Sequence, residues 1–377
     1  MTIVPQANPG AGYLAQKKEI DAAIARVLSS GRFVLDSEGV AFEREFAKWL
    51  GTPHAVACAS GTDALILLLR GLGIGVGSSV VTVSHTSVAT ITAIEIVGAV
   101  PILVDIEPDY YTMDPMDLEA VLARVPRDVP PIRAIIPVHL YGQPANMTRL
   151  LDVCRRHELV LIEDCSQAHG ARYQGHKVGT SADGAAFSLY PTKNLGCLGD
   201  GGVLATRNAE VSDRITGLRQ YGWRKRMIST EVGMNSRLDE IQAAILRVRL
   251  GRLDSANARR ESIAAAYDEA LACSSLRPPA RRPGAQHVFH QYVIRPANRA
   301  AVQSHLHALG IGTAVHYPVP IHRQPAYAGR VALGPSGCRV TDSIAGQILS
   351  MPIYPELTDG EVDFVCKALR ASEAQAA

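Results

Sequence analysis

The fold of this chain is decided by residues 54–105, which read HAVACASGTDALILLLRGLGIGVGSSVVTVSHTSVATITAIEIVGAVPILVD. Three short runs rich in β-branched residues, at 54–60, 79–84 and 100–105, alternate with two runs of helical periodicity, at 62–73 and 87–98. Strands and helices that alternate in this way form βαβ units, whose successive strands lie parallel. We therefore predict an α/β protein with a mainly parallel sheet inside a three-layer αβα domain.

The same pattern continues downstream and then changes. The strand-like runs IRAIIPV and LVLIED flank the amphipathic NMTRLLDVCRRH, whereas DGAAFSLY and GGVLAT have no helix between them, so one strand pair there can be antiparallel. Later come helical patterns over 235–250 and 253–272, a Pro-rich break, a strand in HVFHQYVIR, a helix in VQSHLHALG, an irregular Pro/His/Tyr segment and a last helix over 359–371. We place a domain boundary near Gly251, which predicts a large domain with an N-terminal arm over 1–250 and a smaller C-terminal α/β domain over 251–377.

Composition limits the class of protein. With 377 residues, 20% charged and 47% hydrophobic, the chain has the balance of a folded soluble enzyme, and a net charge of +2 predicts no nucleic-acid partner. The seven cysteines are odd in number and include no C-x-x-C pair, so we expect neither a disulfide framework nor a metal site. We expect neither a signal peptide nor a membrane span, and a cytoplasmic location.

One lysine lies in an unusual loop. The segment FSLYPTKNLGCLGDGG, residues 187–202, places Lys193 just after a predicted strand, in a loop that holds Gly196, Gly199, Gly201 and Gly202. A lysine in a loop is ordinarily a solvated surface residue, so Lys193 alone indicates nothing. Whether Lys193 is a reactive amine depends on which residues lie near it in the fold.

The first such neighbour is in LVLIEDCSQAHGA, where an apolar strand ends in two adjacent acids, Glu163 and Asp164. Because successive strand residues point to opposite faces, only one of them can enter a site, and Asp164 stands at the carboxyl end where open α/β sheets bind ligands. Glu163 then faces a packed helix or solvent. A buried aspartate needs a cationic partner, which a protonated pyridine nitrogen of pyridoxal 5′-phosphate (PLP) would supply; the alternative is that Asp164 caps a helix over 165–170.

The second neighbour is the junction Ser60–Gly61–Thr62, where a strand turns into a helix. Free backbone N–H groups at such a helix start can bind a phosphate, although Ser, Gly and Thr are also ordinary capping residues. Together with Lys193 and Asp164, this junction completes the outline of a PLP site.

Four motifs, SGTDALILLL, EDCSQAHGA, FSLYPTKNLGCLGDGG and GMNSRLDEIQAAILR, occur in one order and spacing that resembles the sugar-nucleotide aminotransferases, a branch of the fold-type I PLP enzymes, over nearly the whole chain. The resemblance implies that Lys193 forms the Schiff base with PLP, that Asp164 meets the pyridine nitrogen and that Gln167 packs near the ring face. It further implies a phosphate site made by Gly61, Thr62, Ser188 and, from a neighbouring subunit, Asn235 at the start of a predicted helix. A homodimer with shared sites follows from it.

Finer similarity in VTVSHTSVAT, VHLYGQPANM and IGTAVHYPVPIHRQPAY resembles the subgroup that aminates dTDP-3-oxo-6-deoxyhexoses at carbon 3. This implies transfer of an amino group from L-glutamate to a nucleotide-linked keto sugar, giving a dTDP-3-amino-3,6-dideoxyhexose for a glycan such as O-antigen or for a natural product. Lys193 would move the proton in both half-reactions, which favours an amine pKa lowered toward neutrality. His316, Tyr317 and His322 would face the nucleotide sugar, or else the prolines merely rigidify a loop with exposed histidines.

The basic cluster of Arg219, Arg224, Lys225 and Arg226 is either a solvated face or a phosphate site. Arg226 stands where the family often has a diphosphate-binding lysine, which gives the cluster a candidate purpose. Two departures leave substrate preference open. Ser87, a predicted cofactor contact, occupies the position where many relatives stack an aromatic ring on PLP, and Trp223 replaces a smaller residue.

Three rival functions stand beside this prediction. The first is a 4-aminotransferase of another keto-sugar nucleotide. The second is PLP-dependent sugar dehydration, against which Lys193 argues because the dehydrating members carry histidine there. The third is a regulator that binds PLP or a nucleotide sugar without turnover, which a shared fold never excludes.

Overall fold

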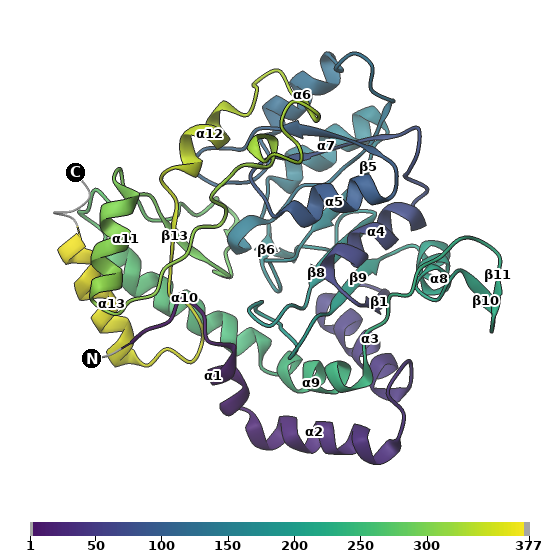
Figure 1. The fold of residues 1–377 in the computed structure, drawn as a ribbon, viewed down its shortest axis with the longest axis horizontal. Coiled ribbons are helices and arrows are strands. Elements are labelled where there is room, and N and C mark those ends of the chain that lie inside the picture. Colours follow the sequence, from purple (N-terminus) through teal and green to yellow (C-terminus); the bar gives the residue numbers. More distant parts are fainter. Residues whose placement is uncertain (1–2, 373–377) are drawn as a thin grey trace.

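An eight-stranded sheet forms the centre of the molecule in this computed structural model, which describes residues 3–372 (Figure 1). The strand order across the sheet is β1-β9-β8-β5-β4-β2-β3-β14. The bounds are β1 (His54–Cys58), β2 (Ser79–Val83), β3 (Val100–Val104), β4 (Ile132–Ile135), β5 (Val160–Asp164), β8 (Gly184–Ser188), β9 (Gly202–Thr206) and β14 (Ala332–Leu333). The predicted βαβ pattern therefore does build one sheet.

Strand β9 runs against its neighbours. It pairs antiparallel with both β1 and β8, whereas the pairs β5/β8, β4/β5, β2/β4, β2/β3 and β3/β14 are all parallel. The connection from β8 to β9, residues 189–201, contains no helix, and this fits the reversal because parallel neighbours are usually joined by a crossover helix. The prediction of one antiparallel pair beside a mainly parallel sheet is confirmed.

Helices cover both faces of the sheet and give the three predicted layers (Figure 1). On one face α4 (Gly61–Gly71), α5 (Val88–Ile96) and α8 (Ala209–Leu218) share a core with Val80 and Ile162. On the other face lie α3 (Ser37–Leu50), α6 (Pro115–Ala123), α7 (Met147–His157) and α9 (Glu240–Leu250). The alternation of side chains along a strand sends Val81 to this second face, one residue after Val80.

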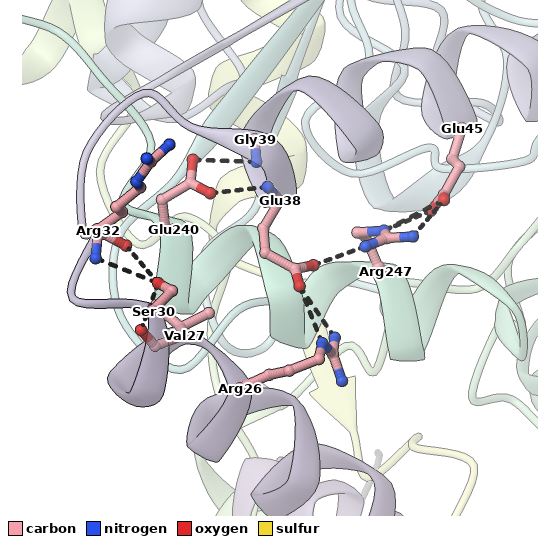
Figure 2. A network of polar contacts seen from close by, with 9 residues as sticks. All are labelled: Arg26, Val27, Ser30, Arg32, Glu38, Gly39, Glu45, Glu240 and Arg247. Atoms are coloured by element: carbon pink, nitrogen blue, oxygen red, sulfur yellow. Dashed lines mark hydrogen bonds and ion pairs between the residues drawn. The ribbon is translucent and has the colours of Figure 1, made fainter.

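A glutamate from α9 fixes the start of α3, which follows the N-terminal helices α1 (Pro9–Leu14) and α2 (Lys17–Ser30) in the chain. Glu240 accepts hydrogen bonds from the backbone N–H groups of Asp36 (2.9 Å), Glu38 (2.7 Å) and Gly39 (3.0 Å), as Figure 2 shows for the last two. These are donors that an α-helix cannot satisfy by itself. In the same network, Arg247 pairs with Glu38 and Glu45, so α9 is anchored to α3 along its length (Figure 2).

The C-terminal part has a core of its own. It comprises α10 (Leu253–Ala270), α11 (Arg299–Ala308), α13 (Asp359–Ala371) and the antiparallel pair β13 (Tyr292–Ile294) and β15 (Leu349–Met351). Val4 of the N-terminal arm joins this core, whereas β14 leaves the C-terminal part and extends the large sheet at β3. The remaining elements are η1 (Leu140–Gly142), η2 (Ile321–Arg323), α12 (Arg339–Ala345), the hairpin β10 (Trp223–Lys225) and β11 (Ile228–Ser229), and the small sheet of β6 (Arg172–Tyr173), β7 (His176–Lys177) and β12 (Ala285–Gln286). The domain boundary at residue 250 stays a prediction.

Two element predictions were wrong in extent. The helix expected from Asn235 begins at Glu240, because residues 235–239 are extended and form isolated bridges, Gln220 with Asn235 and Val34 with Asp239. The strand expected over 287–295 is reduced to 292–294, because the N–H groups of Val288 and Gln291 bond instead to the loop at 141–142. In the part of the chain that the structure describes, no helix has both the length and the apolar composition to cross a bilayer.

Candidate active site

A cavity of about 250 Å³ opens at the carboxyl end of β5, between α4, α5 and the loop after β8. Of the predicted site residues, eight line it: Gly61, Thr62, Ser87, Asp164, Gln167, Ser188, Lys193 and Tyr317. These residues come from five segments of the chain, at 61–62, 87, 164–167, 188–193 and 317. The structure therefore brings together most of the site that the sequence predicted.

The loop after β8 holds Lys193 firmly. Its backbone N–H donates to the carbonyl of Tyr190 (2.9 Å), and a Cβ at Gly196 would lie 2.6 Å from the carbonyl oxygen of Pro191, so only glycine lets the loop fold back here. Burial lowers the pKa of the Lys193 amine to about 8, against the opposing effect of the negative charge on Asp164. A larger share of neutral amine at physiological pH is what a nucleophile or a proton acceptor requires.

Asp164 enters the cavity from the face of α4 and α5. Its side chain is 4% exposed; Oδ2 accepts from the hydroxyl of Thr90 (2.9 Å) and Oδ1 from the N–H of Ser166 (3.1 Å). Glu163 points to the opposite face, as predicted, where it lines a small cavity with Met147 and Leu151 of α7. It is fully buried and accepts from Nε2 of His139 (2.9 Å) and from the N–H of Gly179 (2.8 Å). Residues 165–170 form turns, so Asp164 is not a helix cap.

The start of α4 is packed directly against the ends of β8 and β9. Ser60 caps the helix by accepting from the N–H of Asp63 (3.0 Å), while Gly61 and Thr62, whose N–H groups have no partner within the helix, line the cavity with Ser188. A Cβ at Gly61 would lie 2.6 Å from Cβ of Ser188, so glycine is needed for this approach. The positive end of the helix dipole and the free donors together make a site for an anion such as a phosphate.

Tyr317 and Gln167 are bonded to each other in the wall of the cavity. Nε2 of Gln167 donates to the hydroxyl of Tyr317 (3.1 Å), and Oε1 of Gln167 accepts from the N–H of Tyr141 (2.7 Å). Burial raises the pKa of Tyr317, and a hydrogen bond with Ser87 opposes this. Ser87, which also caps α5 by accepting from Ala89, thus serves as a polar contact. Gln167 is held with one orientation because both ends of its amide are bonded.

Four predicted residues do not line this cavity. His316 bonds through Nδ1 to Ser350 (2.9 Å), and burial together with the charge of Lys193 lowers its pKa to about 4. His322 is buried between Ser84 (2.7 Å to Nδ1) and Asp342 (3.1 Å to Nε2), so it is not an exposed loop histidine. Arg226 lies in the turn of the β10–β11 hairpin, which projects from the body of the molecule (Figure 1), and Asn235 is exposed at its base. Their side chains are available to a second chain.

Other contributors were missed by sequence reasoning. Thr90, the partner of Asp164, lies in the quoted motif VTVSHTSVAT, but only the packing of α5 on β5 reveals its role.

A buried cluster on the other side of β5 consists of His139, Glu163 and Cys165, whose ligand-type atoms lie within 4.8 Å of one another. In this cluster His139 and Glu163 are hydrogen-bonded to each other. Arg219 is separate from the exposed basic cluster, because it is 7% exposed and bonded to Glu43 and the carbonyl of Ala57.

The residues present fit PLP. The cavity offers an amine of lowered pKa at Lys193, a buried carboxylate at Asp164 and a helix start at Gly61 and Thr62. In the described residues, Asp164 has two hydrogen-bond donors but no ion pair, so it can still accept from a protonated ring nitrogen. Asp164 would hold the ring nitrogen, Lys193 would bond to the aldehyde carbon, and the start of α4 would hold the phosphate.

Known proteins resemble this chain over nearly its whole length. Residues 15–370 match the model of the DegT/DnrJ/EryC1/StrS aminotransferase family. A dTDP-3-amino-3,4,6-trideoxy-alpha-D-glucose transaminase from Streptomyces venezuelae is 46% identical over 97% of this chain and 95% of its own. The crystal structure of S. venezuelae DesV in complex with a ketimine intermediate superimposes with a TM-score of 0.94, at 45% identity over 98% of both chains.

The fold and the cofactor are confirmed by the same comparisons. NtdA from Bacillus subtilis, solved with bound PMP, the amino form of PLP, is 28% identical and matches with a TM-score of 0.87, covering all of this chain and 86% of its own. The chain thus has the fold-type I aminotransferase architecture, and PLP is the cofactor. With nearly its whole length matched, the chain belongs to the DegT/DnrJ/EryC1/StrS family and is a PLP-dependent sugar-nucleotide aminotransferase.

Proposed function

We propose that this enzyme transfers the amino group of L-glutamate to carbon 3 of a dTDP-linked 3-oxo-6-deoxyhexose. The observation that carries the proposal is the meeting of Lys193, Asp164 and the α4 start in one cavity. The choice of a 3-amino dTDP sugar is supported by the 46% identity to a transaminase named for such a sugar. A 4-aminotransferase of another keto-sugar nucleotide is the alternative.

Each residue has a definable task. PLP supplies the carbonyl that exchanges amino groups and the ring that takes up the electron pair. Asp164, held by Thr90 and Ser166, keeps the ring nitrogen protonated. The amine of Lys193 removes and returns the proton at the reacting carbon of each substrate, for which its pKa of about 8 is suited.

A second copy of the chain completes the site in this proposal. Asn235 and Arg226 carry no hydrogen bond or ion pair of their side chains within the described residues, and both are exposed. We assign Asn235 to the phosphate site and Arg226 to the nucleotide diphosphate of the neighbouring subunit. The backbone next to Asn235 is held in place, because the hydroxyl of Ser236 donates to Asp63 (2.6 Å) and accepts from the N–H of Ala59 (3.1 Å). We also place the enzyme in the cytoplasm, where its seven free thiols would stay reduced.

The deciding experiment uses the absorbance of the bound cofactor. L-Glutamate alone should convert the PLP form to the PMP form, and a dTDP-3-amino-3,6-dideoxyhexose should do so in the reverse direction. Lys193→Ala should abolish the visible absorbance of bound PLP and the conversion. A spectrum unchanged by any amino donor would indicate a binding protein without turnover, and preference for 4-amino sugars would replace the proposed substrate.

Shared sites can be tested by mixing two inactive variants. Lys193→Ala and Asn235→Ala homodimers should both be nearly inactive, but mixed dimers should regain activity, because one of their two sites contains neither substitution. Lack of any recovery in a verified mixed dimer would contradict a shared site.

A further inference from the structure

A second, smaller cavity lies on the other side of the Lys193 loop. Its volume is about 80 Å³, and it is enclosed by the N-terminal arm, the junction of α9 and α10 and residues 353–356. In Figure 1 the purple N-terminal arm runs from the C-terminal part of the molecule through α1 to α2. Lys193 lines this cavity as well as the active-site cavity. A group bound here would therefore lie next to the reactive amine.

Two arginines face this cavity with unused donors. Arg260 is 5% exposed and donates through Nη1 to the carbonyls of Phe289 (3.2 Å) and Ile353 (2.7 Å), while its Nε has no partner among the described residues. Arg249 donates through Nη1 to the carbonyl of Gly196, and its inaccessible Nε and Nη2 likewise have no partner in that part of the chain. Burying guanidinium N–H groups without an acceptor costs free energy, so both side chains favour an incoming anion.

The charge around the cavity is unbalanced. Arg252 also lines it, but Arg252 is half-exposed and paired with Glu19 (2.6 Å). Arg249 and Arg260 remain as cations, Lys193 is partly neutral because of its lowered pKa, and Glu356 is the one carboxylate among the lining residues. Burial lowers the pKa of Arg260 to about 10, and the charge of Glu356 opposes this. An occupant with one negative charge would bring the sum of charges closer to zero.

His290 adds a neutral polar group to the same wall. It is 5% exposed, its Nδ1 has no hydrogen-bond partner among residues 3–372, and burial holds its pKa well below the usual range, with the charges of Lys193 and Arg260 acting in the same direction. The histidine therefore lies within electrostatic reach of the reactive amine and of the buried arginine.

We propose that this cavity binds the side-chain carboxylate of the amino donor, L-glutamate. The proposal rests on the proposed transamination and names the residues that would select its donor. A carboxylate fits because it matches the planar fork of a guanidinium, and the 80 Å³ volume admits such a small group. Because Lys193 lines both cavities, a donor whose side chain is bound here would place its amino group beside the Lys193 amine, which it displaces from PLP. Arg249 and Arg260 bind the carboxylate, and Glu356 limits its affinity by repulsion.

The test compares two donors of equal chain length in the half-reaction that forms PMP. L-Norvaline lacks the side-chain carboxylate of L-glutamate. Arg249→Met should lower the rate constant with subsaturating L-glutamate about 10- to 100-fold and leave L-norvaline within about twofold, since a hydrogen-bonded charge pair is lost with only one donor. Arg249→Lys should recover part of the loss. Arg252→Met, at the ion-paired arginine of the same wall, should leave both donors unchanged.

Glu356→Gln supplies a change of opposite sign. In the described structure Glu356 makes no hydrogen bond or ion pair, so its loss should raise the rate with subsaturating L-glutamate and not that with L-norvaline. If Arg249→Met slowed both donors equally, the arginine would merely hold the carbonyl of Gly196, and the proposal would be overturned.

Binding of glutarate, a dicarboxylate without an amino group, separates the two proposals. By calorimetry, glutarate should bind the wild-type holoenzyme and bind Arg249→Met at least about tenfold more weakly. Should L-glutamate fail to form PMP while this difference persists, the transamination would be wrong and the anion site correct. Equal glutarate affinity in both proteins would refute the site, whatever the activity.

Discussion

The hydroxyl of Thr90 on α5 donates a 2.9 Å hydrogen bond to Oδ2 of Asp164 at the end of β5, and both side chains are buried. Asp164 is thereby oriented by a residue 74 positions away in the sequence. The second oxygen accepts from the N–H of Ser166, so the carboxylate has two fixed donors and still faces the cavity. The sequence predicted Asp164 as a site residue but did not predict Thr90, which orients it.

Thr90→Val removes this hydroxyl with little change of volume. Because hydrogen bonds to charged groups contribute about 1.5–3 kcal/mol, we expect kcat to fall about tenfold or more, with fold and PLP content retained. Steady-state kinetics and cofactor absorbance measure this. Thr92→Val, on the same helix and near Tyr327, is the matched control. Unchanged kinetics in Thr90→Val would mean that Ser166 alone positions Asp164.

Uptake of PLP by the apoenzyme should depend on pH through Lys193. Burial lowers the pKa of its amine from 10.5 to about 8, and only the neutral amine attacks an aldehyde, so the rate should rise with pH around a midpoint near 8. The charge of Asp164 raises this pKa, and Asp164→Asn should therefore shift the midpoint to lower pH. Stopped-flow absorbance between pH 6 and about 10 measures both. A wild-type midpoint near 10 would contradict the lowered pKa.

Gly202→Ala tests the close packing behind the proposed phosphate site at the start of α4. A Cβ at position 202 would lie 2.1 Å from the carbonyl oxygen of Ser60, which is backbone and cannot move without displacing the start of α4. We expect destabilisation of about 1–3 kcal/mol in urea and at least tenfold weaker PLP binding. Gly346→Ala, where a Cβ meets nothing within 4 Å, is the control. Normal PLP affinity in Gly202→Ala would show that the turn tolerates displacement.

His287 should make the protein less stable in acid. Burial lowers its pKa to about 3, with Arg281 acting in the same direction, and its Nδ1 accepts from the N–H of Phe289 (2.8 Å). Below pH ~6.5 the imidazole is protonated in the unfolded chain but stays neutral in the folded chain. The contribution of His287 to the free energy of unfolding is therefore complete above that pH. It is lost as the pH falls toward 3, by up to ~1.4 kcal/mol per pH unit.

His287→Asn should remove that share of the slope. Urea unfolding at several pH values between 4 and about 7 would compare the variant with the wild-type protein. His157→Asn on the exposed side of α7 is the control. A slope that stays the same in His287→Asn would show that the buried imidazole is not coupled to folding.

Local patterns determined much of this protein without any structure. Alternating strand and helix periodicity specified the parallel sheet because each element has to bury one apolar face, and the missing helix between residues 188 and 202 indicated the antiparallel β9. Lys193, Asp164 and Gly61 could be predicted as site residues because the ends of strands and the starts of helices, where ligands bind, can be recognised from the local sequence. The prediction that Glu163 and Asp164 point apart needed only the geometry of a strand.

Tertiary structure alone decided what these residues meet. Thr90, Tyr141 and Ser236 act through contacts over long sequence separations, and the helix predicted from Asn235 was shortened by pairing with Gln220. The second cavity joins residues 6–16, 249–260 and 353–356, and no periodicity or motif marks it. Burial and pairing depend on which distant segments pack together, so the sequence predicted the reactive lysine while only the fold revealed the unpaired arginines behind it.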